Sequence, residues 1–163
     1  MMDHLYAPWR AVYLMDFDKT DDGCLFCNIL AGGDDRENLV LERSDLWYLM
    51  INRFPYTTGH LMIVCNRHIE WFGELTADEN GTMTDMLVRT EKALVDAYKP
   101  HAVNVGVNIG RDAGAGVEGH LHIHLVPRWQ GDTNFMTAVG KTRVLSEALE
   151  DTYDRLKKAL ESI

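Results

Sequence analysis

Three histidines alternate with aliphatic residues in the run His120-Leu121-His122-Ile123-His124-Leu125-Val126. Successive side chains of a β-strand point to opposite faces, so we expect the three imidazoles on one face and the aliphatic side chains buried on the other. The chain has only 7 histidines in 163 residues. Three on one short strand therefore favour phosphoryl or metal chemistry over a solvent-facing strand that is merely rich in histidine.

Each histidine of this strand suits a different task. A neutral imidazole can attack phosphorus and form a phosphoramidate, while a neighbouring ring can hydrogen-bond the non-bridging oxygens. His122 is flanked on both sides and is the predicted nucleophile. His124 is the predicted phosphate ligand or donor, which leaves His120 free to bind a metal or to orient the others.

A glycine-rich loop, residues 110–119, directly precedes the histidine strand. Glycines let backbone amides turn inward and cradle phosphate oxygens. Ordinary β-connections are also rich in glycine, and the position of this loop beside the histidines is what favours a phosphate site.

A second cluster with chemical potential is Cys24-Leu25-Phe26-Cys27. A Cys-x-x-Cys pair brings two thiolates within reach of one zinc ion, and a closed tetrahedral site needs two further ligands. The histidine candidates for those ligands are His60, His68, His101 and His120. A redox dithiol usually opens a helix in a βαβ context, which this sequence does not predict; two small buried hydrophobic residues are the other alternative.

The elements that must position these groups are strands around one long helix. Thr76 and Glu79 form a capping box that starts a helix running to about Tyr98, and Pro100 stops it. A C-terminal helix is predicted from about Leu145 to Leu160. Strands are predicted at residues 39–42, 46–51, 60–65, 102–109 and 120–126, with Pro127 ending the last strand or lying at a sheet edge. We expect one antiparallel α+β domain over residues 1–163, with residues 1–22 as an N-terminal arm.

Composition limits the classes of partner. The chain is 46% hydrophobic and 25% charged, with a formal net charge of -9. This balance argues against broad nucleic-acid binding, which needs a basic face. There is no signal-peptide pattern and no apolar run long enough to cross a bilayer. With three cysteines and no disulfide framework expected, we predict a cytoplasmic protein without a membrane partner.

The histidine strand resembles the signature of the histidine triad (HIT) superfamily, His-φ-His-φ-His-φ-φ with φ apolar, and matches it completely from His120 to Val126. The stretches 52–55 and 59–64 are similar to the nucleoside-binding segment of that family. The resemblance covers the chain from about Cys24 onward. It implies a HIT-like fold with a bent antiparallel sheet, a long central helix and a C-terminal helix.

The resemblance also implies functional residues. His122 would form a nucleotidyl-histidine by attacking the α-phosphorus, with His120 and His124 completing the catalytic set, and Asn52 would contact the ribose hydroxyls. Family members with a structural zinc resemble this chain at four residues: Cys24, Cys27, His68 and His120. The resemblance further implies a homodimer.

Residues 126–136 and the N-terminal stretches 7–10 and 13–14 are similar to the bacterial diadenosine tetraphosphate phosphorylases of this superfamily, which use inorganic phosphate as the final acceptor. The residues that would map onto their phosphate and nucleotide contacts are Asn108, Gly114, Ala115, Gly116 and Trp129. Position 116 commonly carries Gln in the dinucleoside hydrolases and Ser in the phosphorylases, and here it is glycine. The choice between water and phosphate as acceptor is therefore open.

We therefore expect a nucleotide hydrolase or nucleotidyltransferase that cleaves dinucleoside polyphosphates at the α-phosphate. Three rival interpretations remain. The first is a hydrolase of other nucleotide conjugates, such as nucleoside phosphoramidates. The second is a non-catalytic nucleotide-binding module, which Gly116 favours. The third is a zinc-stabilised interaction domain in which the histidines act only as ligands.

Overall fold

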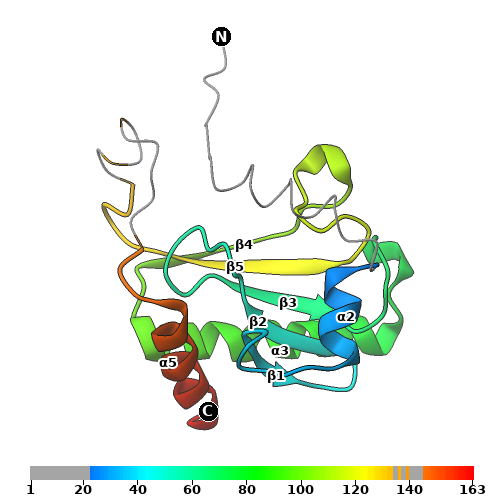
Figure 1. The fold of residues 1–163 in the computed structure, drawn as a ribbon, viewed down its shortest axis with the longest axis horizontal. Coiled ribbons are helices and arrows are strands. Elements are labelled where there is room, and N and C mark those ends of the chain that lie inside the picture. The colour runs from blue at the N-terminus through cyan, green and yellow to red at the C-terminus, as the bar shows by residue number, and fades with distance from the viewer. Residues whose placement is uncertain (1–22, 134–135, 137–138, 140–144) are drawn as a thin grey trace.

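The computed structural model describes residues 23–133, 136, 139 and 145–163. In this part of the chain, five strands form one antiparallel sheet in the order β1-β2-β3-β5-β4 (Figure 1). The expected antiparallel α+β architecture is confirmed, whereas the proposed N-terminal arm, residues 1–22, lies outside the described residues. The strands are β1 (Val40–Arg43), β2 (Trp47–Ile51), β3 (Leu61–Cys65), β4 (Ala102–Gly106) and β5 (His122–Arg128).

In the part of the chain that the structure describes, three α-helices and two short 3-10 helices accompany the sheet. They are α2 (Leu25–Ala31), η1 (Phe72–Glu74), α3 (Ala77–Tyr98), η2 (Arg111–Ala113) and α5 (Leu149–Glu161). The predicted capping box starts α3, because the Thr76 hydroxyl accepts from the Glu79 N–H and the Glu79 carboxylate accepts from the Thr76 N–H. None of the helices in the described ranges combines the length and apolar character that crossing a membrane requires.

The C-terminal helix starts at Leu149, four residues later than the predicted Leu145. Two residues in the intervening segment are engaged elsewhere. The Ser146 N–H donates to the Thr58 hydroxyl, and the Glu147 carboxylate accepts from the Tyr98 hydroxyl. These tertiary contacts hold the segment in a non-helical path, which local periodicity did not reveal.

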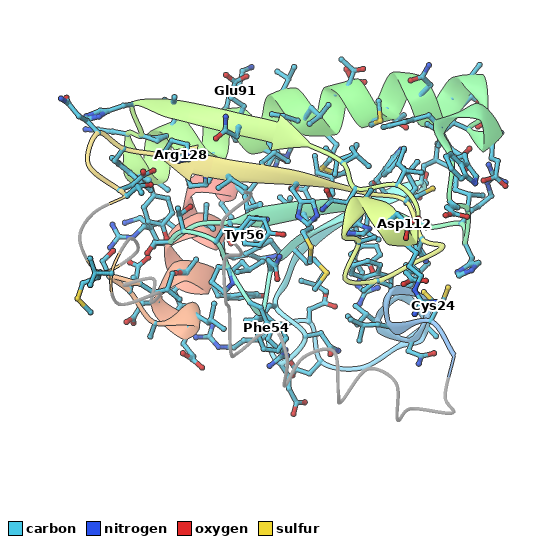
Figure 2. The ribbon with its side chains drawn as sticks, turned by 90° about the horizontal axis from the view of Figure 1, so that it is seen from above. Cys24, Phe54, Tyr56, Glu91, Asp112 and Arg128 are labelled. Carbon is cyan, nitrogen blue, oxygen red and sulfur yellow. The ribbon has the colours of Figure 1, made fainter. Side chains whose placement is uncertain are left out.

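Two apolar layers cover opposite faces of the sheet. The larger lies between the sheet and helices α3 and α5, and the smaller packs α2 on the other face. Figure 2 shows α3 on one side of the strands and Cys24, just before α2, on the other. Leu121, Ile123 and Leu125 belong to the larger core. The two-residue period of β5 therefore turns His122 and His124 toward the α2 face, as the sequence predicted.

Strand register arranges a row of side chains across the α2 face. His124 pairs with Met62, Met62 with Met50, and Met50 with Val40. This row leads from the histidine strand to the edge strand β1.

Pro127 is neither the end of its strand nor an edge residue, which corrects the expectation. It lies within β5, opposite Val103 of β4 and beyond Leu125, the last residue of β5 in register with β3. A proline lacks a backbone N–H, and at this position no pairing with β3 needs one.

Candidate active site and candidate metal centre

The His122 side chain is buried, and its tautomer is set by the backbone. Its Nδ1 lies 2.7 Å from the carbonyl oxygen of His120 and must donate to it, because a carbonyl only accepts. The remaining ring nitrogen, Nε2, then carries a lone pair in the neutral ring. Burial lowers the pKa of His122 below the ordinary 6.5, against the raising effect of that hydrogen bond. Near neutral pH the ring is therefore uncharged and nucleophilic.

His124 is oriented by a second chain of hydrogen bonds. The backbone N–H of Tyr56 donates to Nδ1 of His60 at 3.1 Å, so His60 carries its proton on Nε2. That nitrogen lies 2.9 Å from Nδ1 of His124 and donates to it. A neutral His124 therefore carries its own proton on Nε2, as a hydrogen-bond donor. His60, one of the four histidine candidates for the zinc site, thus pairs with His124 and is not part of the metal cluster.

Both histidines face a cavity of about 200 Å³ between α2 and the sheet. Apart from the histidine end, its walls are largely apolar, which is typical of a small-molecule site with a few polar groups. The lining residues are Leu25, Phe26, Ile29, Asn38, Met50, Asn52, Arg53, Phe54, Tyr56, Met62, Asn108, Gly116, Val117, His122 and His124.

The predicted binding residues divide between this cavity and its surroundings. Asn52, Asn108 and Gly116 line it, whereas Gly114 and Ala115, from the same glycine-rich loop, do not. Gly114 ends η2 in a left-handed conformation with φ of 84°. Only the last part of the predicted phosphate loop therefore reaches the cavity.

A larger cavity of about 1010 Å³ lies on the other side of His124 and shares Tyr56, Asn108 and His124 with the smaller one. Trp129 lines this larger cavity, where its ring meets the edge of the Tyr98 ring at 6.3 Å between centroids. Trp129 thus forms part of the wall of this cavity near the end of α3.

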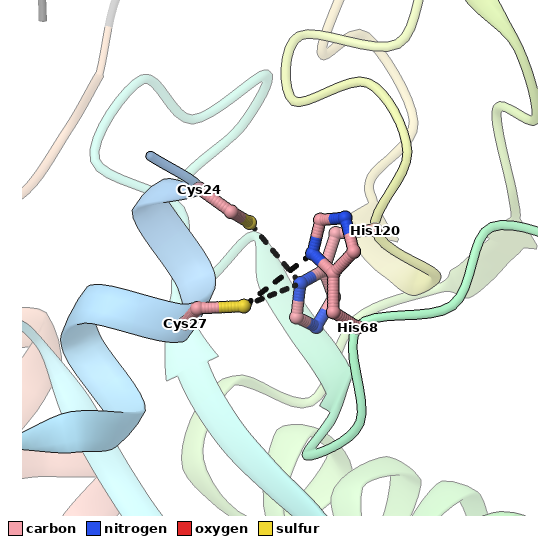
Figure 3. Close-up of side chains that lie close together, drawn as sticks. All are labelled: Cys24, Cys27, His68 and His120. Atoms are coloured by element: carbon pink, nitrogen blue, oxygen red, sulfur yellow. Dashed lines mark hydrogen bonds between the residues drawn. The ribbon is translucent and has the colours of Figure 1, made fainter. Parts of the chain in front are cut away.

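The second predicted cluster forms at the start of α2 (Figure 3). Cys24 Sγ lies 3.2 Å from Nδ1 of His120, and Cys27 Sγ lies 3.4 Å from Nδ1 of His68 and 3.6 Å from that of His120. The ligand atoms of all four residues lie within 4.8 Å of one another. A tetrahedral zinc ion with ordinary bond lengths separates a sulfur from a nitrogen by about 3.5 Å. The donor set therefore fits one metal ion.

Two details favour a metal over a plain hydrogen-bond cluster. Nε2 of His120 donates to the carbonyl of Cys65 at 2.7 Å, which leaves Nδ1, the nitrogen facing the thiols, as a ligand. Burial alone would raise the pKa of Cys24, but hydrogen bonds to His120, to the Cys27 backbone and to His68 outweigh it and lower the pKa to about 6. A thiol in this setting readily becomes the thiolate that metals bind.

The structure also places residues that the sequence analysis did not single out for the site. The Phe26 ring, between the two cysteines, contacts the rings of His120 and His122 at centroid distances of 5.4 and 5.0 Å. Tyr56 stacks on His124 at 6.0 Å. Asn38 lines the smaller cavity at the C-terminal side of α2. The position of Phe26 inside the Cys-x-x-Cys motif was the one available signal.

The fold and the histidine strand define a histidine triad protein, and the comparisons agree. The sequence model of the HIT domain matches residues 34–131. The chain therefore belongs to the HIT family, and the resemblance seen in the sequence is confirmed.

Among curated relatives, a protein named AP-4-A phosphorylase from Mycobacterium tuberculosis is 39% identical over 118 residues, which is 72% of this chain and 60% of that protein. This chain thus spans about 60% of that relative's length. The bis(5'-nucleosyl)-tetraphosphatase [asymmetrical] of Schizosaccharomyces pombe is 27% identical over 93 residues, covering 57% of this chain and 50% of that protein.

Among solved structures, the fold is similar to that of a Zn-bound histidine triad family protein from Mycobacterium smegmatis. The TM-score is 0.69 at 22% identity, over 86% of this chain and 94% of that one. This match confirms the expected fold class.

Proposed function

We propose that this protein is an enzyme that cleaves dinucleoside polyphosphates, such as diadenosine tetraphosphate, at the α-phosphate. The observation that carries the proposal is the tautomer of His122, whose lone pair is on Nε2 because Nδ1 donates to the His120 carbonyl. A buried, neutral imidazole in the wall of a cavity is the nucleophile that phosphoryl transfer through a covalent intermediate requires. The names of the M. tuberculosis and S. pombe relatives support this substrate class.

In this proposal one nucleoside occupies the cavity of about 200 Å³. Asn52 contacts the ribose, while Asn108 and the backbone at Gly116 bind phosphate oxygens. Trp129 contacts the remainder of the substrate in the larger cavity. The shared position of His124 between the two cavities suits a bond that is cleaved at their junction.

The reaction runs in two displacements. Nε2 of His122 forms a bond to the α-phosphorus, and the bond from phosphorus to the leaving phosphate oxygen breaks. The Nε2–H of His124 donates a hydrogen bond to phosphate oxygens as charge develops there. Water or inorganic phosphate then attacks the same phosphorus and breaks the P–N bond, which restores His122.

We further propose a structural zinc ion held by Cys24, Cys27, His68 and His120. The Zn-bound M. smegmatis neighbour supports this choice of metal. The ion would fix α2 to the residue that precedes β5, and His120 then positions His122 through its carbonyl. In this role zinc supplies structural coordination only, and no chemical step passes through it.

We also propose a cytoplasmic homodimer. The edge strand β4 is mostly exposed, and Val105 on it has 57% of its surface accessible. An exposed edge strand readily pairs with another strand. Light scattering of the full chain should give twice the monomer mass, and a monomer mass would contradict this assembly.

The function is tested by incubating the protein with diadenosine tetraphosphate, with and without inorganic phosphate. ADP plus ATP identifies phosphorolysis, and AMP plus ATP identifies hydrolysis. His122→Ala should abolish either product. Wild-type protein that turns over neither this substrate nor other nucleotide conjugates would contradict the proposal.

A non-catalytic nucleotide-binding module is the second candidate, and Gly116 is the observation that favours it. Gly116 lines the cavity without the polar side chain common at this position in the enzymes. Tight AMP binding with no turnover would support this candidate. Activity toward an adenosine phosphoramidate alone would instead identify a hydrolase of other conjugates.

A further inference from the structure

Three asparagines line the cavity of about 200 Å³, and they lie in different settings. Asn108 also borders the larger cavity, so it lies toward the junction marked by His124. The Asn52 Oδ1 already accepts from the Phe54 N–H at 2.9 Å. The side-chain amide of Asn38 forms no hydrogen bond with any residue that the structure describes. The Asn38 amide is therefore available to a ligand at its end of the cavity.

The register of the sheet places Asn38 at the end of the cavity remote from the histidines. It lies two residues before Val40, where β1 begins, and the row from Val40 to His124 crosses four strands. Neighbouring strands are about 4.8 Å apart, so the backbones of β1 and β5 are separated by about 14 Å. The side chains at the two ends occupy part of this distance. The length that is left matches a nucleoside monophosphate with its phosphate at His122 and its base near Asn38.

The side-chain amide of Asn38 is oriented with its nitrogen toward Gly33. Its Nδ2 lies so close to this glycine that a Cβ on Gly33 would be only 2.7 Å from it. The amide oxygen is on the other side of Cγ and points away from Gly33. The group offered for recognition is therefore an acceptor, Oδ1, on the wall of an otherwise apolar pocket.

We propose that Asn38 is a specificity-determining residue that selects a 6-amino purine. The inference rests on the proposed function, because it takes the cavity as the nucleoside site. Adenine places an amine, a donor, at position 6, and the Asn38 oxygen accepts from it. Guanine and hypoxanthine place an oxygen there, and two acceptors facing each other repel. Asn38 thus favours adenosine over inosine or guanosine in the bound nucleotide.

AMP and IMP provide the direct test, because these two ligands differ only in the base, where the exocyclic 6-amino group and unprotonated N1 of adenine are replaced by a 6-oxo group and an N1–H. Calorimetry should show that the wild-type protein binds AMP about tenfold more tightly than IMP, the range expected for one hydrogen bond gained against one acceptor clash. Asn38→Ala should weaken AMP binding and tighten IMP binding, so that the two affinities become equal within about twofold. Asn38→Asp retains an acceptor and should retain the preference for AMP.

The control is Asn80→Ala, on the exposed face of α3, which should leave both affinities unchanged. Equal binding of AMP and IMP by wild type, binding of neither, or an equal loss of both in Asn38→Ala would overturn the inference. Turnover of diadenosine tetraphosphate is measured separately. Its absence together with a normal AMP preference contradicts the proposed function and leaves the role of Asn38 supported.

Discussion

The carbonyl oxygen of His120 accepts a hydrogen bond from Nδ1 of His122 at 2.7 Å, and the His120 ring lies 3.2 Å from the Cys24 sulfur. One residue thus belongs to the candidate metal centre through its side chain and to the candidate active site through its backbone. Any disturbance of the metal cluster should therefore reach the orientation of the nucleophile.

Removing a cysteine ligand should release the metal and loosen the site. Cys24→Ser is expected to bind less zinc than the wild-type protein, which should bind about one ion per chain. Its melting temperature should be lower by about 5 °C or more, because a structural zinc contributes folding free energy. Elemental analysis and a thermal melt measure the two effects. Cys65→Ala is the control for zinc content and should still bind about one ion per chain, since the Cys65 side chain is outside the cluster. Full zinc content in Cys24→Ser would contradict the assignment.

Activity should fall at acid pH only below the ordinary histidine range. Burial lowers the pKa of His122 beneath 6.5. The imidazolium that forms as the pH falls through this lowered pKa has no lone pair with which to attack phosphorus. The acid limb of the kcat/KM profile, which reports the free enzyme, should therefore have its midpoint below pH 6.5. A midpoint above 6.5 would show that His122 is not held neutral by burial.

The His60–His124 pair gives a separate prediction about kcat. His60→Ala removes the donor that fixes the His124 tautomer, and kcat should fall by about tenfold to a hundredfold with a smaller change in KM. His60→Gln can still present an N–H and should recover part of this loss. Steady-state kinetics tests both variants, and circular dichroism checks their folding. If the two variants lose the same activity while remaining folded, the tautomer argument fails.

The acid stability of the fold should depend on Glu79. The Arg67 guanidinium lowers the pKa of this buried carboxyl to about 2, against the raising effect of burial and with help from Thr76. In the unfolded chain its pKa is near 4.5, so below that pH the unfolded state takes up a proton that the folded state resists. The stabilisation is complete above about pH 4.5 and is lost as the pH falls toward 2.

Urea unfolding at a series of pH values measures this effect. Glu79→Gln should lower the free energy of unfolding at pH 7 by about 1–3 kcal/mol and should flatten its decline between pH 4.5 and 2. Asp78→Asn, at the neighbouring exposed position, should leave the pH dependence as in wild type. If the free energy of unfolding of Glu79→Gln declines with acid as in wild type, groups other than Glu79 cause the acid sensitivity.

Local pattern was enough to predict much of this architecture. The Thr76–Glu79 capping box marked the start of α3, and alternation on β5 separated the histidines from the buried Leu121 and Ile123. These features depend on residues close together in the chain. The delayed start of α5 could not be predicted, because it depends on contacts with Thr58 and Tyr98, which are distant in sequence.

In the candidate sites too, some features are visible in the local sequence and others depend on residues that are distant in the chain. Spacing revealed the Cys24–Cys27 pair but left four histidines open as partners, and the choice of His68 and His120 required the family resemblance. The His60–His124 hydrogen bond joins residues 64 positions apart. Asn38 has no local signal at all, because its position beside the cavity arises from the pairing of β1 with β2.

The central claim is that His122 forms a covalent bond to the α-phosphorus. Mass spectrometry of the protein, mixed with diadenosine tetraphosphate and denatured at alkaline pH to preserve a phosphoramidate, tests it most directly. The expected result is a mass increase of one adenylyl group, located on the peptide that contains His122 and missing from His122→Ala. Product formation by wild type with no adduct at any time after mixing, together with undiminished turnover by His122→Ala, would contradict it.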